Sequence, residues 1–166
     1  MALTAVAVLV HELGHYVSLR LCGGEVSCIR ISLLGAAMDY TNLSYNGEVI
    51  AGLCGPAASI MLALFAALSG RVFAHEPSTH LAGLSLILGV FNLLPAFPLD
   101  GGRALFGTVA QLLGLHAAEL SRRLVTLLVI AILLVLGAYL LVRTRNPTLA
   151  AAAIWLGYNA FFVTRL

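Results

Sequence analysis

The sequence contains an uncharged apolar run from Leu124 to Val142, and this run constrains the fold more than any other feature. An α-helix needs about 20 predominantly apolar residues to cross the hydrocarbon core of a bilayer. The composition extends the argument to the whole chain, since 61% of its 166 residues are hydrophobic and only 10% are charged. Soluble domains carry roughly 25% charged residues. The sequence therefore predicts an integral membrane protein.

Further apolar stretches predict membrane spans at about Met1–Leu21, Val49–Leu68, Leu81–Leu94 and Leu149–Val163. The last two are weaker candidates because they are shorter than about 18 residues. Together with the run described above, these stretches predict about five transmembrane helices. The apolar residues between Arg103 and Leu113 follow helical spacing, which predicts a short helix lying at the membrane interface.

The loop after the first span has a different periodicity. From Ile29 to Leu33, apolar residues alternate with polar ones, a period of two that is typical of a β-strand. The pair Leu34-Gly35 can turn the chain into a second strand over Ala36–Tyr40. The predicted fold class is therefore an all-α polytopic membrane protein with a small membrane-associated β-hairpin after the first helix.

The first apolar stretch is interrupted by the string His11-Glu12-Leu13-Gly14-His15. On a helix, residues i and i+4 project from one face, so both imidazoles can bind the same metal ion. Glu12 lies beside the first histidine, where its carboxylate can accept a proton from an activated water. Zinc suits this set because it takes nitrogen and oxygen ligands. Ionisable groups in a lipid-length stretch are costly, which favours a metal site over an exposed polar helix face.

Two histidines and a water leave one protein ligand of a tetrahedral zinc site to be found. The favoured candidate is Asp100; the other acidic residues near apolar runs are Asp39, Glu48 and Glu119. Asp100 follows Pro95 and Pro98, which break the helix, and irregular backbone at membrane depth must be buried or line a wet cavity. Alternatively, Asp100 is the N-cap of a helix that begins near Arg103. The residues alone leave both roles open.

Taken together, the motifs resemble those of the site-2 protease family, the intramembrane zinc metalloproteases. The string His11–His15 matches HExxH, and Asn92–Gly102 contains N-x-x-P-x-x-P-x-D-G. Between them, Gly55–Ser59 fits the family's G-x-x-x-small pattern. The short form without a PDZ insertion is most similar to the branch of sporulation-factor processing proteases. The resemblance implies one membrane-embedded metalloprotease domain over residues 1–166, with a catalytic core at about 1–105 and C-terminal helices at about 120–166.

Residue by residue, the resemblance implies that His11, His15 and Asp100 bind Zn2+ and that Glu12 is the general base. It also implies that Asn92 helps to hold the substrate or the developing oxyanion. From the residue alone, an amide in a span can equally form an interhelical hydrogen bond. Both interpretations of this asparagine therefore stay open.

The resemblance also implies partners and a location. The substrate would be a membrane protein or membrane-associated precursor, cut in or near its transmembrane segment, and a regulatory membrane partner is compatible with the family. The location would be a bacterial or archaeal cell membrane. With five spans, six of the nine arginines lie on the side that contains the loop after the first span. The excess predicts that this side, and the active site, face the cytoplasm. The scattered arginines and the net charge of +2 argue against a nucleic-acid partner.

Two other functions are compatible with a metal site in a membrane. The first is a non-catalytic scaffold that uses zinc for stability, although such a site has no need of Glu12 beside its ligand. The second is a metal transporter, in which the polar residues line an ion path. A transporter is expected to have several intramembrane polar clusters, whereas the remaining spans are nearly bare of them.

Overall fold

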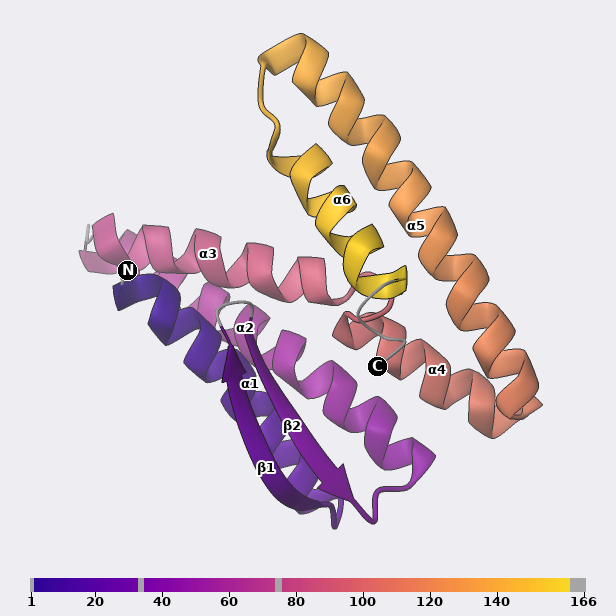
Figure 1. Ribbon diagram of the computed structural model, residues 1–166. Helices are drawn as coiled ribbons and strands as arrows, with labels where there is room; N and C mark the ends of the chain where they lie inside the picture. Colours follow the sequence, from indigo (N-terminus) through magenta and orange to yellow (C-terminus); the bar gives the residue numbers. More distant parts are fainter. Residues whose placement is uncertain (1, 33–34, 74–75, 162–166) are drawn as a thin grey trace. The chain divides into compact units, whose positions relative to one another are not determined.

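The computed structural model describes residues 2–32, 35–73 and 76–161 of the chain. Six helices and two strands occupy these residues (Figure 1): α1 (Ala2–Leu21), β1 (Glu25–Ser32), β2 (Gly35–Thr41), α2 (Tyr45–Phe73), α3 (Glu76–Asn92), α4 (Asp100–Leu113), α5 (Leu115–Thr144) and α6 (Thr148–Phe161). The chain divides into two compact units, Met1–Leu93 and Leu94–Leu166. The predicted fold class, helical with one small hairpin, is confirmed.

In the described residues each predicted apolar stretch lies on a helix, except that α3 ends at Asn92, two residues before the predicted end at Leu94. Among the residues that the structure describes, three helices are long and apolar enough to cross a membrane, namely α1, the Tyr45–Val72 part of α2, and α5. The helices on the two weaker candidate stretches are shorter, with 17 residues in α3 and 14 in α6. The uncharged run is part of a longer helix than expected, because α5 begins at Leu115 and has 30 residues.

In the first unit, α1 packs against both α2 and α3, which also pack against each other (Figure 1). Gly14 of α1 lies directly against α2. A Cβ atom at this glycine would lie 2.6 Å from the carbonyl oxygen of Cys54 and 2.8 Å from Cβ of Ala58. Small residues allow such close approach of membrane helices, where packing and not hydrophobic burial drives association.

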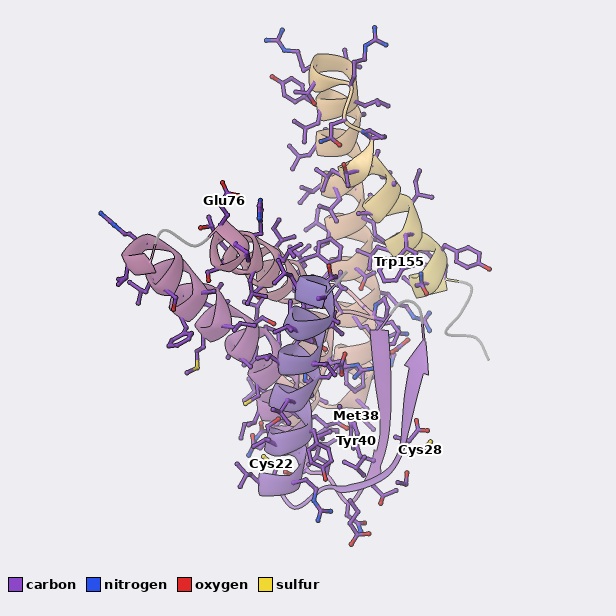
Figure 2. All side chains as sticks on the ribbon, turned by 90° about the vertical axis from the view of Figure 1, so that its left-hand side faces the viewer. Cys22, Cys28, Met38, Tyr40, Glu76 and Trp155 are labelled. Carbon is purple, nitrogen blue, oxygen red and sulfur yellow. The ribbon has the colours of Figure 1, made fainter. Side chains whose placement is uncertain are left out.

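The hairpin also belongs to the first unit, and both of its strands contact α1. Its antiparallel register pairs Glu25 with Thr41 and Ser32 with Gly35, with an irregularity between Val26 and Cys28. The two predicted strands are confirmed, whereas Leu33 and Leu34 at the predicted turn lie outside the described residues. Met38 and Tyr40 lie on the face toward α1, and Cys28 lies on the opposite, exposed face (Figure 2).

In the second unit, α5 packs against both α4 and α6. The start of α4 differs from the prediction, because the helix begins at Asp100 and not near Arg103. Leu99 occupies the N-cap position and provides no side-chain cap. The alternative that Asp100 is the N-cap is therefore wrong. Gly102 lies in the first turn of α4 and packs against the backbone of Ala96, where a Cβ atom on the glycine would lie 2.6 Å from the carbonyl oxygen.

Candidate metal centre

The two histidines of the motif lie one turn apart on α1 and direct one ring nitrogen toward each other. Their Nε2 atoms are 3.2 Å apart, and the rings meet edge to face with centroids 4.8 Å apart. Two nitrogens that bind one zinc tetrahedrally at roughly 2.0–2.1 Å would be about 3.3 Å apart. The spacing of His11 and His15 therefore fits two ligands of a single zinc ion.

The ring of His15 is held so that Nε2 is the nitrogen available to a metal. Its Nδ1 lies 2.7 Å from the carbonyl oxygen of Ala51 on α2. A carbonyl oxygen only accepts hydrogen bonds, so Nδ1 must carry the proton and donate it. In the neutral imidazole the lone pair is then on Nε2, which is the arrangement that zinc-binding histidines adopt.

His11, like His15, is oriented by a residue of α2, in this case by a side chain. Its Nδ1 lies 2.9 Å from the hydroxyl of Ser59, which is completely buried, and His11 itself is only 4% exposed. A hydroxyl can accept or donate. With a metal on Nε2, Nδ1 carries the proton and Ser59 accepts it. Both imidazoles thus have a partner on α2 behind the nitrogen that would bind the metal.

Gly55 lies between these two partners and provides the space for the second ring. A Cβ atom at this position would lie 2.1 Å from Nε2 of His15, far inside van der Waals contact. Ala51, Gly55 and Ser59 follow one another at intervals of four residues and so share one face of α2. In the sequence, Gly55 and Ser59 match the family's G-x-x-x-small pattern, and this row of small residues indicated only close helix packing. Its role in orienting the histidines was missed, although its position between the two motifs was a signal.

The predicted general base, Glu12, is half-buried on α1 beside the first histidine. Consecutive residues of an α-helix are about 100° apart around its axis, so this carboxylate projects in a different direction from the two imidazoles. This direction is compatible with a base that is not itself a ligand. The assignment of Glu12 as the base stays a prediction.

Asp100 is the first residue of α4 and is 8% exposed. The loop before it is compact: Ala96 is completely buried, and its carbonyl oxygen accepts the N–H of Leu99 at 2.8 Å. A buried carboxylate is costly unless it is paired, hydrogen-bonded or coordinated to a metal, and a helix N-terminus favours its negative charge. These features suit an oxygen ligand. That Asp100 completes the zinc site stays a prediction.

Asn92 ends α3, immediately before the proline-containing loop. Its Nδ2 donates a hydrogen bond of 3.0 Å to the carbonyl oxygen of Leu88, within the same helix. The hydrogen bond that the structure gives this amide is therefore not interhelical. Because an amide nitrogen carries two N–H groups, one is left for a further acceptor. The role of Asn92 toward substrate or an oxyanion stays a prediction.

Comparison with known proteins points to the same chemistry. Residues 69–136 match the family described as peptidase family M50. A zinc metalloprotease of Methanocaldococcus jannaschii is 31% identical over 114 residues, which are 66% of this chain and 34% of the relative. A Synechocystis protein, provisionally named a zinc metalloprotease, is 34% identical over 116 residues, or 65% of this chain and 30% of its own length. The chain thus spans about a third of the length of these curated relatives.

The fold has a counterpart among solved structures. The site-2 protease from Methanocaldococcus jannaschii superimposes with a TM-score of 0.74 and 25% sequence identity, covering 96% of this chain and 74% of the other. The predicted zinc cofactor agrees with the family and with the names of these relatives. The nitrogen donors of His11 and His15, which the structure brings together, fit that metal.

Proposed function

We propose that this integral membrane protein is a member of the site-2 protease family, peptidase family M50, and that it is a zinc metalloprotease that hydrolyses a peptide bond in or near the transmembrane segment of a membrane-tethered substrate. The observation that carries the proposal is the pair of Nε2 atoms of His11 and His15, 3.2 Å apart. The hydrogen bond from Nδ1 of His15 to the Ala51 carbonyl supports it, because it leaves Nε2 for the metal.

We assign Asp100 as the third protein ligand and Glu12 as the general base. The chemistry that zinc supplies in such a site is polarisation of a carbonyl and activation of water near neutral pH. Glu12 accepts the proton of the attacking water and passes it to the leaving amine, as a general acid–base residue does. Asn92, at the end of α3, has an N–H group for the developing oxyanion or for the substrate backbone.

The substrate must present an extended segment, because a helix keeps its carbonyl groups in its own hydrogen bonds. The hairpin offers a surface for such a segment. In the described part of the chain β1 and β2 pair only with each other, so each has an outer edge of backbone groups. An unwound substrate segment can add to the edge near residues 29–32 as a further strand. Release of a regulatory fragment, and a regulatory membrane partner, are parts of this proposal that rest on the family.

Orientation is also part of the proposal. Arg20, Arg103 and Arg122 belong to the more basic of the two sides, which we take to be cytoplasmic. His15 precedes Arg20 by one and a half helical turns, about 8 Å along the axis. We therefore expect the metal centre in the cytoplasmic part of the bilayer of a bacterial or archaeal cell membrane.

Metal analysis of the purified chain tests the assignment of the centre. We expect about one zinc per chain, the stoichiometry of a mononuclear site, and its loss in His11→Ala and His15→Ala. His80→Ala is a matched control, because His80 is exposed on α3 and should not affect the metal. A wild-type chain without zinc, or histidine variants that retain it, would contradict the proposal. Zinc flux across liposomes without any proteolysis would favour a transporter.

A further inference from the structure

The second unit contains a set of contacts between α5 and the loop that precedes Asp100. The backbone N–H of Phe97 donates a hydrogen bond of 3.0 Å to the hydroxyl of Thr126, which is only 4% exposed. The guanidinium carbon of Arg122 lies 4.8 Å from the centroid of the Phe97 ring. Arg122 and Thr126 are four residues apart and so share a face of the helix. Two side chains of α5 therefore hold both the backbone and the ring of one loop residue.

Arg122 is itself held in place. Its Nε and Nη2 atoms donate to the two carboxylate oxygens of Glu119 at 2.8 and 2.7 Å, a bidentate pair. Such a pair fixes the plane of the guanidinium as well as its position. A fixed cation over an aromatic face is attracted by the ring quadrupole. The position of the Phe97 ring is thus coupled to α5 through a rigid side chain and not through a mobile one.

The loop transmits the position of Phe97 to the start of α4. The carbonyl oxygen of the neighbouring Ala96 accepts the N–H of Leu99, the residue before Asp100. Ala96 is completely buried and packs against Gly102 so closely that a Cβ atom there would lie 2.6 Å from the Ala96 carbonyl oxygen. Although the Phe97 side chain itself is only half-buried, the backbone at Ala96 has little space in which to absorb a shift of the neighbouring residue. A displacement of this residue would therefore move Asp100.

We propose that Thr126 and Arg122 are positioning residues for the metal ligand Asp100, and that α5 serves the active site by fixing the loop from Leu94 to Leu99. This inference rests on the proposed function, because it assumes that Asp100 binds zinc. It gives the C-terminal helices a role in metal binding, for which their sequence carries no motif. The predicted consequence is a zinc affinity that depends on the hydroxyl at position 126.

Zinc affinity of the full chain in detergent, measured by competition with a chelator, tests the inference. In Thr126→Val the acceptor for the Phe97 N–H is lost, and we expect about tenfold weaker zinc binding, the lower end for loss of an outer-shell partner. Thr126→Ser keeps the hydroxyl and should restore most of the affinity. Thr144→Val is the control, because Thr144 is an exposed residue of the same helix. A Thr126→Val variant with wild-type affinity would overturn the inference, even if its melting temperature were lower.

Hydrogen exchange of the metal-free protein gives a second measurement that does not depend on zinc. Peptides covering residues 94–102 should exchange faster in Thr126→Val and in Arg122→Gln than in wild type or in the control Arg143→Gln. If Thr126→Val does not fold, the exchange rates of Arg122→Gln alone test whether α5 holds the loop. A wild-type chain that binds no zinc would contradict the proposed function, and the exchange rates would still decide whether α5 holds the loop. Unchanged exchange in both variants would show that it does not.

Discussion

The completely buried hydroxyl of Ser59 lies 2.9 Å from Nδ1 of His11, across the contact between α1 and α2. The opposite nitrogen of this ring lies 3.2 Å from Nε2 of His15. The serine thus lies behind one of the proposed metal ligands, where such a residue sets the orientation of the ring and the nitrogen that carries the proton. Such residues do not bind the metal, yet the geometry of the centre depends on them.

The first prediction concerns this contact. Ser59→Ala removes the hydrogen-bond partner of His11, and we expect zinc affinity to fall about 10- to 100-fold. Ser69→Ala is the control, because Ser69 lies on the same helix but is only half-buried and its hydroxyl donates to the carbonyl oxygen of Phe65, within its own turn. Chelator competition measures both variants. Equal zinc affinity in Ser59→Ala and wild type would show that Ser59 does not support zinc binding.

The second prediction concerns the space for His15. Gly55→Ala would place a methyl group 2.1 Å from Nε2 of this ring, so the ring must move or the two helices must separate. We expect loss of zinc binding and a lower melting temperature. Gly83→Ala is the matched control, because nothing lies within 4 Å of its added Cβ. In the control we expect unchanged zinc binding and a gain in stability of up to about 1 kcal/mol, the difference in helix propensity. Normal zinc binding in Gly55→Ala would contradict the proposed geometry.

The third prediction separates the ligand from the residue assigned to the oxyanion. Asp100→Ala should weaken zinc binding, because it removes the oxygen ligand, whereas Asn92→Ala should keep zinc and slow cleavage. Asn159→Ala controls for the loss of an amide that bonds within its own helix, since Asn159 donates to the carbonyl of Trp155 as Asn92 does to that of Leu88. Zinc content and cleavage rate are measured on the same samples. Full zinc affinity in Asp100→Ala would show that Asp100 is not the third protein ligand.

The proposed metal ligands stand out in the sequence, whereas the residues that orient them do not, for a physical reason. His11, His15 and Asp100 are ionisable, and an ionisable group within or beside an apolar stretch is costly enough to indicate function. Ser59 and Thr126 carry hydroxyls that are common in membrane helices, where they usually bond to their own backbone. Their importance follows only from which segments the fold brings together.

Most elements of the fold could also be predicted from the sequence, whereas the start of one helix could not. Apolar length predicted which segments are helical, and alternation of apolar and polar residues predicted the hairpin. The start of α4 was placed three residues too late, near Arg103 and not at Asp100. In the structure both Gly101 and Gly102 lie in the first turn of the helix, and the lack of a side chain at Gly102 admits the backbone of Ala96.

The fourth prediction concerns orientation in the membrane. After replacement of the three native cysteines, a cysteine at position 116 should react with an impermeant reagent from the cytoplasmic side and one at position 79 from the outside. His116 and Thr79 are both exposed, whereas the nearby Ala118 is completely buried and would be a poor probe. Labelling of His116→Cys from outside, with Thr79→Cys shielded there, would reverse the proposed topology and put cleavage at the opposite face.

The most direct test of the central claim compares zinc-loaded wild type with Glu12→Gln in the cleavage of a panel of single-span membrane proteins in liposomes. The substitution keeps the size of the side chain but removes its ability to accept a proton. We predict that wild type cleaves at least one of these proteins, and that Glu12→Gln retains about one zinc per chain while cleaving at least about 100-fold more slowly. Cleavage by Glu12→Gln at the wild-type rate would contradict the account, and so would loss of zinc from this variant.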